Sequence, residues 1–319
     1  MNFIQKAVAW VDRFQQRHTV PGFLYAVIKK QGDDQGGYQT ALLAYYAFWS
    51  LFPLLIVFTT VTQLLLSGNP GLRNDVSNSV THYFPILGNH LQQSVQASGK
   101  TGVALGISLL LTLYGARGVA NAFQHTVNHI WRVPQAERPG FPKNLLKSLA
   151  LIGAGGLGLV GASVVAGFAT GGSHILWLRI VSMVLSALLL FVIFVFLFRV
   201  SLAKNVEVRE LVGGAVVAAL GLTLLQVAGG FVVTHELKNL NSLYGSFAVT
   251  LGLLFWLSLQ AQVIVYALEV NTVRAQKLWP RSLVGDEPTE ADKRAQRLRL
   301  DEPLRQEKAG DPDESPASI

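Results

Sequence analysis

Five polar residues close to the end of the last long apolar run have types and spacing that could do chemistry. Gln262, Tyr266 and Glu269 recur at helical intervals, and Gln260 and Asn271 lie beside them. Because polar groups inside a membrane-spanning helix are costly, they often mark a functional site, and we expect this surface to line a polar path. The alternative is that these residues only form hydrogen bonds between helices, which contribute about 0.6–2 kcal/mol per pair.

Arg117 is the second candidate, because it ends the uncharged half of an earlier helical segment. One interpretation is that its long side chain reaches from the helix end to lipid headgroups. The other is that it forms a buried ion pair, with Glu269 as a candidate partner, or binds an anionic headgroup. The sequence leaves both interpretations open.

The usual groups of an enzyme are scarce. His125 and His129 have a spacing that can bind a metal, but a zinc protease needs Glu after the first His, and no third ligand is evident. Asp33 and Asp34 adjoin Gly-rich sequence, where such a pair is more often a solvated turn. The chain has no cysteine, which excludes a thiolate site and a disulfide. We therefore expect no metal, no cofactor and no enzymatic activity.

These candidates must be positioned by membrane-spanning helices. Of the 319 residues 50% are hydrophobic and only 14% are charged, the mean hydropathy is +0.38, and the charges gather at the ends and in short loops. A spanning helix needs about 20 mostly apolar residues. The sequence thus predicts an all-α, polytopic membrane protein with six transmembrane helices, over residues 41–66, 101–117 (continuing as a helix to 131), 148–170, 179–198, 211–234 and 245–268.

The distribution of lysine and arginine predicts the orientation. Most of the 26 basic residues lie in alternate segments, whereas the opposite side holds only Arg73, Lys100, Arg179 and Lys238. Positive charge is retained in the cytoplasm, so we expect a multi-pass protein of the cytoplasmic (inner) cell membrane with both termini in the cytoplasm. We expect the formal net charge of +7 to face anionic lipid headgroups rather than nucleic acid. The oligomeric state is left open.

Two segments flank the six-helix membrane domain, which we place at residues 41–273. Within residues 1–40, apolar residues recur at helical spacing, and this pattern indicates an amphipathic helix that lies on the membrane surface or packs on the protein. Residues 274–319 are interpreted as a basic juxtamembrane segment followed by a disordered or weakly helical cytoplasmic tail. The apolar residues of the N-terminal pattern are Phe3, Ala7, Trp10, Val11 and Phe14.

Small residues predict which spans pack closely, because they let helix backbones approach one another. The third span carries them at four-residue intervals, and the fifth carries two glycines on one face. The fourth span is built almost throughout from large apolar residues and is predicted to face lipid. Pro53 is expected to kink the first span. The residues expected at helix contacts are Ala154, Gly158, Ala162, Ala166, Gly213 and Gly221.

Three stretches together resemble a known family. They are AYYAFWSLFP at 44–53, LYGARG at 113–118 running to NHIW at 128–131, and YGSF at 244–247 with QAQ at 260–262 and EVN at 269–271. This combination, over about residues 35–280, is similar to the BrkB/YihY family of inner-membrane proteins, formerly misnamed the ribonuclease BN family. The resemblance implies six helices and cytoplasmic termini, and it transfers no catalytic residue.

The resemblance also bears on function, since members of that family have been linked to serum resistance and to envelope lipid export. Our leading expectation is a transporter or a lipid-translocating protein whose partner is membrane lipid with anionic headgroups. The alternative is a non-transporting membrane scaffold or envelope-integrity factor that acts through its terminal segments. A membrane-bound nuclease or hydrolase is a third hypothesis, for which the sequence lacks the usual clustered groups.

Overall fold

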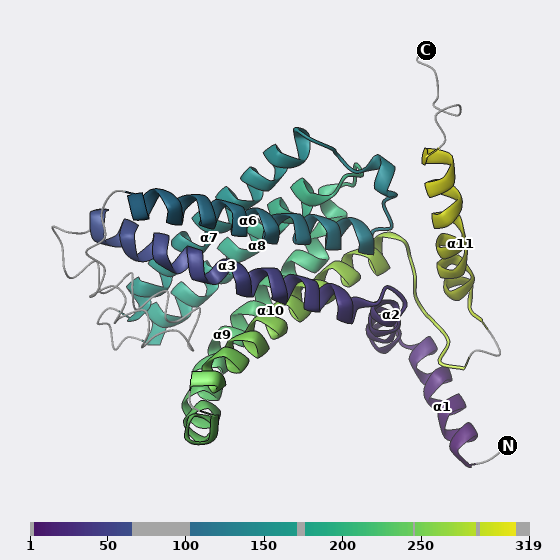
Figure 1. Ribbon diagram of the computed structural model, residues 1–319. Helices are drawn as coiled ribbons and strands as arrows, with labels where there is room; N and C mark the ends of the chain where they lie inside the picture. Colours follow the sequence, from purple (N-terminus) through teal and green to yellow (C-terminus); the bar gives the residue numbers. More distant parts are fainter. Residues whose placement is uncertain (1–2, 66–102, 171–175, 245, 285–287, 311–319) are drawn as a thin grey trace.

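Every regular element in the described part of the chain is helical, as the sequence predicts. The computed structural model describes residues 3–65, 103–170, 176–244, 246–284 and 288–310. Figure 1 shows the helices and their order. They are α1 Phe3–Arg17, α2 Thr19–Asp33, α3 Gly36–Leu65, α6 Val103–Ile130, the short 3-10 helix η2 Gln135–Glu137, α7 Lys143–Thr170, α8 Leu176–Ser201, α9 Val208–Tyr244, α10 Ser246–Ala275 and α11 Glu290–Gly310.

Three of the described helices are long and apolar enough to cross a membrane. Their spanning segments are Ile180–Ser201 in α8, Val208–Gln226 in α9 and Thr250–Ala275 in α10. They correspond to the fourth, fifth and sixth predicted spans. The first three predicted spans fall on α3, α6 and α7, and their status as spans stays a prediction. α3 runs through Pro53 as one helix, but that side chain lies outside the described part.

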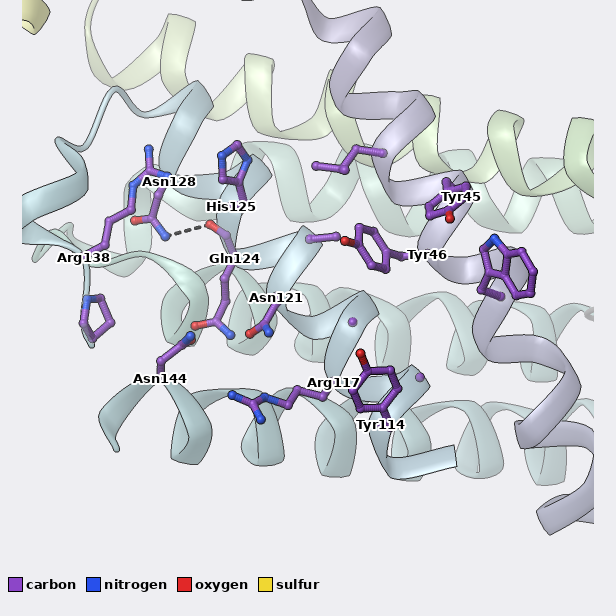
Figure 2. Close-up of a pocket in the computed structure, with 16 residues that line it drawn as sticks. Tyr45, Tyr46, Tyr114, Arg117, Asn121, Gln124, His125, Asn128, Arg138 and Asn144 are labelled. Atoms are coloured by element: carbon purple, nitrogen blue, oxygen red, sulfur yellow. Dashed lines mark hydrogen bonds between the residues drawn. The ribbon is translucent and has the colours of Figure 1, made fainter. Parts of the chain in front are cut away.

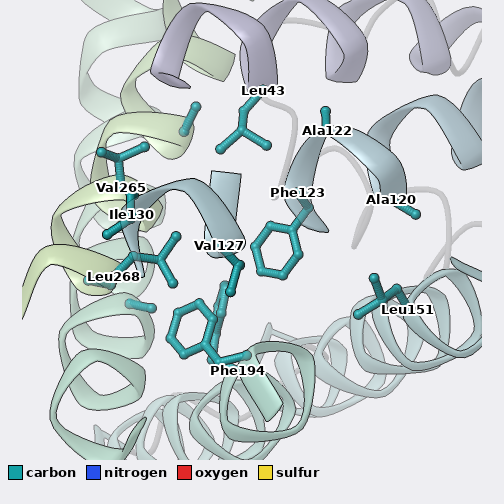
Figure 3. Packing of buried hydrophobic residues seen from close by; sticks show 14 of the residues in the cluster. Leu43, Ala120, Ala122, Phe123, Val127, Ile130, Leu151, Phe194, Val265 and Leu268 are labelled. Atoms are coloured by element: carbon teal, nitrogen blue, oxygen red, sulfur yellow. The ribbon is translucent and has the colours of Figure 1, made fainter. Parts of the chain in front are cut away.

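The long helices form a bundle with distinct ends. α1, α2 and α11 lie at the end where α3 begins and α6 ends (Figure 1), which we call the capped end. The buried core joins side chains of α3, α6, α8 and α10 (Figure 3), and Phe123 stacks on Phe198 with ring centroids 6.1 Å apart. Where a helix would otherwise meet water, burial of such side chains is the main favourable contribution to stability. Where it would otherwise meet lipid, close packing between helices provides the stabilisation instead.

α8 turns most of its apolar side chains outward. Only 11% of its spanning segment is buried. Exposed residues recur every fourth position and therefore form one stripe along the helix. An exposed apolar stripe is what a lipid-facing helix requires, and the position of the fourth span against lipid stays a prediction. The stripe consists of Ile180, Val184, Leu188, Val192 and Phe196.

Glycines set the distance between α9 and α10, which are neighbours in the bundle. A Cβ atom on Gly214 would lie 2.1 Å from the carbonyl oxygen of Ala267, and one on Gly221 would lie 2.6 Å from the Val263 side chain. Gly213 lies beside Val270 and Arg274. In α7, a Cβ on Gly158 would lie 2.4 Å from Ile193 of α8, and Ala154 is half-buried. The side chains of Ala162 and Ala166 lie outside the described part.

The C-terminal segment, for which the sequence left open a disordered or a weakly helical tail, forms the helix α11 over residues 290–310. The hydroxyl of Thr289 accepts a hydrogen bond from the Asp292 N–H at 3.2 Å, and Asp292 in turn accepts one from the Thr289 N–H at 3.2 Å. This reciprocal capping starts a helix. Ala291 and Ala295 are buried, and Asp292 pairs with Lys29 and Arg281. Residues 311–319 lie outside the described part.

The carboxylates that hold α11 titrate below their usual range. Burial by itself would raise the pKa of Asp292, but hydrogen bonds from the Ser282 N–H, Lys29, Arg281 and Thr289 outweigh it and lower that pKa strongly. The pKa of Asp33 is also lowered, because bonds from Arg281 and Arg299 outweigh its burial. A carboxylate with a lowered pKa stabilises the folded arrangement above its unfolded pKa of about 3.9, and this stabilisation is lost as the pH falls below that value.

We therefore expect α11 to stay docked from neutral pH down to about pH 4 and to separate from α2 only at about pH 2, because the stabilisation is lost as the pH approaches the lowered pKa values of the docked carboxylates. The chain has no cysteine, so Thr19→Cys and Gln296→Cys provide the two spin labels for a distance measurement. The distance between the two labels is measured at neutral and at acid pH. The Asp292→Asn protein should show already at neutral pH the distance distribution that the protein with Asp292 shows only in acid. Identical distance distributions in all these samples would contradict the expected role of Asp292.

Candidate functional site

A cavity of about 960 Å³ lies on the side of the bundle between α3, α6 and the segment that leads into α7. Figure 2 shows aromatic residues at one end and amide and basic residues at the other. None of its 16 lining residues is Asp or Glu. The aromatic residues are Tyr45, Tyr46, Trp49 and Tyr114, and the basic ones are Arg117, His125 and Arg138.

Arg117 lies in the middle of α6. The amide of Asn128 donates to the Ser201 carbonyl oxygen at 2.9 Å, so Asn128 is level with the end of α8. Arg117 precedes Asn128 by 11 residues of α6, which is about 16 Å along the helix. Its guanidinium is exposed to the cavity and has no hydrogen-bond or ion-pair partner among the described residues. If α6 spans the membrane, as the sequence predicts, a charge at this position requires water or a ligand.

The amide residues of the cavity mainly hold the helices together. Gln124 donates to Ser148 of α7 at 3.0 Å, and the Ser148 hydroxyl lies 3.1 Å from Asn121 Oδ1. Asn128 also accepts from the Ala203 N–H at 2.8 Å. Arg138 donates twice to the Val133 carbonyl oxygen, which fixes its position at the cavity wall. Arg117 is thus the basic group in this cavity that is most available to a ligand.

A second site, which we call the ion cluster, is formed by Lys30, Asp34, Arg132 and Glu269 at the capped end. Lys30 Nζ lies 3.0 Å from Glu269 Oε2, donates to the Ile130 carbonyl oxygen at 3.2 Å, and also pairs with Asp34. Arg132 pairs with Asp34 at 2.6 Å. The side chains of Lys30 and Glu269 are 2% and 0% exposed, so water does not screen this pair.

The ion cluster joins helices that are far apart in the sequence. Lys30 belongs to α2, Asp34 follows it, Ile130 ends α6 and Glu269 lies in α10. The formal charges cancel, as burial of ions requires. Glu269 Oε1 is buried and accepts no hydrogen bond from the described residues. Lys30 and Asp34 are four residues apart, which suits a local ion pair. The sequence offered Glu269 only as one candidate partner of Arg117, and in the structure Glu269 pairs with Lys30.

The polar residues predicted on α10 do not form one path in the structure. Thr40 of α3 donates to Gln262 at 3.0 Å, Glu269 bonds Lys30 of α2, and Asn271 accepts from the Gly214 N–H of α9 at 2.5 Å. These residues therefore contact three different helices. Tyr266 packs beside the small apolar cluster of Ala26, Val27 and Val273, and Gln260 is half-buried. None of them lines the cavity that contains Arg117.

The histidine pair of α6 is stacked rather than converging on one point. The ring centroids of His125 and His129 are 6.1 Å apart, His125 lines the side cavity, and His129 lies 3.2 Å from the Asp34 carbonyl oxygen. Across the described ranges, no three His, Asp or Glu residues gather in a way that would hold a metal.

Helices long enough to span a bilayer and a basic cavity among apolar helices define an α-helical membrane protein. The family model described as Virulence factor BrkB matches residues 27–291, and the chain belongs to this family. That range covers α3 through α10 and reaches the first residues of α11, so both sites lie in the shared part. The match confirms the resemblance seen in the sequence.

Three relatives show how far the similarity extends. A putative ribonuclease-like protein of Bacillus subtilis, YfkH, is 25% identical over 79% of this chain and 94% of its own length. A UPF0761 membrane protein of Stenotrophomonas maltophilia is 30% identical over 78% of this chain and 60% of its own length. An uncharacterized protein of Dickeya dadantii is 26% identical over 69% of this chain and 73% of its own. No solved structure gives a significant match.

Proposed function

We propose that this protein binds the headgroup of an anionic membrane lipid in the side cavity and moves that lipid between the leaflets of the cytoplasmic membrane. The observation that carries the proposal is the unpartnered Arg117 in a carboxylate-free cavity beside apolar helices. An arginine fork suits a phosphate group, and aromatic rings suit the boundary between headgroup and acyl chain. The distribution of basic residues supports a cytoplasmic location for the capped end.

The shape of the cavity supports an amphiphile over a small soluble anion. Tyr114 is 80% exposed and Trp49 is 58% exposed, so the aromatic end is open at the side of the bundle. In Figure 2 the Arg117 side chain extends from this end toward Asn144. A ligand that fills the cavity would place its charge near Arg117 and its apolar part at the aromatic end. Such a ligand has the division of polar and apolar parts that a lipid has.

Lipid movement in proteoliposomes tests this function. The protein is reconstituted with headgroup-labelled phosphatidylglycerol, and dithionite is added outside to bleach the accessible dye. We expect the wild-type protein to make the inner-leaflet dye accessible and Arg117→Gln to slow this at least about tenfold. The expectation follows because hydrogen bonds to charged groups contribute about 1.5–3 kcal/mol and 1.4 kcal/mol corresponds to a factor of ten. Arg117→Lys should retain part of the activity.

Arg209→Gln is the matched control, because Arg209 is an exposed arginine at the start of α9 that does not line the cavity. It should behave like the wild-type protein. Bleaching equal to that of protein-free liposomes, or an Arg117→Gln protein as fast as wild type, would contradict the proposed function.

A further inference from the structure

α1 packs with its polar side inward and its apolar side outward. Asp12 and Gln15 are 8% and 4% exposed, whereas Trp10, Val11 and Phe14 are 63%, 45% and 44% exposed. An amphipathic helix on the surface of a water-soluble protein shows the opposite arrangement, with its apolar side buried and its polar side in solvent. From its sequence this helix could meet the membrane or the protein, and in the structure its polar face contacts the protein.

Named hydrogen bonds hold α1 in this orientation. Gln15 donates to the Arg281 carbonyl oxygen at 2.6 Å. Asp12 accepts from the Leu283 N–H at 2.9 Å and from the Ser282 hydroxyl at 3.1 Å. The residues after α10 therefore bind the polar face, and α1 cannot turn its apolar face inward without losing all three bonds.

The outward apolar surface continues on α2. Val20, Leu24 and Ile28 are 69%, 56% and 57% exposed and form a stripe at four-residue spacing. The opposite face of α2 is fixed, because Ala26 packs in a buried cluster and Lys30 pairs with Glu269 of α10. Figure 1 shows α2 nearly end-on, so it runs across the direction of α3 and α6. That is the direction of a helix that lies in the plane of a bilayer which the bundle spans.

The acidic and basic side chains of this segment lie on different sides. Three carboxylates of the segment are bonded within the protein: Asp12 to Ser282, Asp33 to Arg281 and Asp34 to Lys30. On the exposed side of α1 lie Arg13 and Arg17. An apolar surface bordered by arginines and free of exposed acid complements an anionic leaflet.

We propose that the outward surface of α1 and α2, formed by Trp10, Val11, Phe14, Val20, Leu24 and Ile28, inserts into the bilayer leaflet at the capped end. The partner is the anionic lipid surface itself. A bilayer accounts for three observations together: the apolar stripe on both helices, the arginines beside it, and the course of α2 across the bundle. This inference is independent of the ligand in the side cavity.

The absence of cysteine in the chain allows a direct test. Phe14→Cys and Leu24→Cys are labelled with an environment-sensitive fluorophore in nanodiscs of phosphatidylcholine and phosphatidylglycerol. Leu188→Cys in the outward stripe of α8 is the lipid reference, and Gln296→Cys on the exposed side of α11 is the water reference. We expect nitroxide lipids to quench labels 14 and 24, and aqueous iodide to quench them severalfold less than label 296.

Two results would overturn the proposal. Iodide quenching at positions 14 and 24 equal to that at 296 would place the surface in water. Protection from iodide without quenching by nitroxide lipids would place it against protein, and crosslinking between labelled copies would then identify a second chain as the partner. Because positions 14 and 24 are exposed, the substitutions leave the buried contacts of α1 and α2 intact.

Discussion

We expect Lys30→Ala to lower the free energy of unfolding by about 3–5 kcal/mol, the largest effect of any single change considered. The Lys30 ammonium contacts Asp34, Glu269 and the Ile130 carbonyl oxygen, and its side chain is 2% exposed. Its removal leaves Asp34 and Glu269 buried with Arg132 as the remaining cation of the ion cluster. Two carboxylates without a second cation are costly in a site that water does not reach. Thermal unfolding in detergent measures the loss.

Lys29→Ala is the matched control for this change. Lys29 is the neighbouring lysine of α2, is 28% exposed and pairs with Asp292, so its loss should cost about 1 kcal/mol. The double variant Lys30→Met with Glu269→Gln should be more stable than Lys30→Ala, because both members of the pair are neutralised together. If Lys30→Ala unfolds at the same temperature as Lys29→Ala, the ion cluster does not hold α2 to α10.

The second large effect is expected for Gly214→Ala, which should destabilise the protein by about 3 kcal/mol. The new methyl group would lie 2.1 Å from the Ala267 carbonyl oxygen and 2.5 Å from Asn271 Nδ2. A backbone oxygen in α10 cannot rotate aside as a side chain can. α9 and α10 must therefore move apart, and the hydrogen bond from the Gly214 N–H to Asn271 is weakened.

Gly153→Ala separates this steric effect from the general effect of replacing glycine in a helix. A Cβ on Gly153 of α7 meets no atom within 4 Å. Alanine favours the helix by up to about 1 kcal/mol over glycine, so this variant should be as stable as the wild-type protein or more stable. Equal unfolding temperatures for Gly214→Ala and Gly153→Ala would show that α9 and α10 are not packed at this contact.

The two candidate sites differ in how much of them was predictable. Arg117 was identified from the sequence because a charge that ends a long uncharged stretch is conspicuous, but its cavity depends on how α3 and α7 flank α6. Glu269 was identified because it follows the sixth predicted span at helical spacing from Gln262 and Tyr266. Its partner was missed because Lys30 is 239 positions away in the sequence. Only the packing of α2 across the end of α10 brings these two charges together.

In the terminal segments, too, local patterns were predictable from the sequence and contacts between distant residues were not. The apolar pattern of α1 was visible, and the pair Thr289 and Asp292 carried a capping signal for α11 that composition obscured. The contact that joins both segments, from Gln15 and Asp12 to residues 281–283, has no local signature. The composition shows only that the C-terminal segment is polar. Whether α11 docks on the protein depends on the residues that surround it in the fold.

The sequence alone determined the helical class, the family and the apolar helices, because each of these follows from residues that are near one another along the chain. The tertiary structure decided the partner of Glu269, the cavity around Arg117, the docking of α11 and the outward apolar face of α1. These features depend on how helices cross. Crossing is set by close contacts such as that of Gly214 with Ala267, between residues far apart in the sequence.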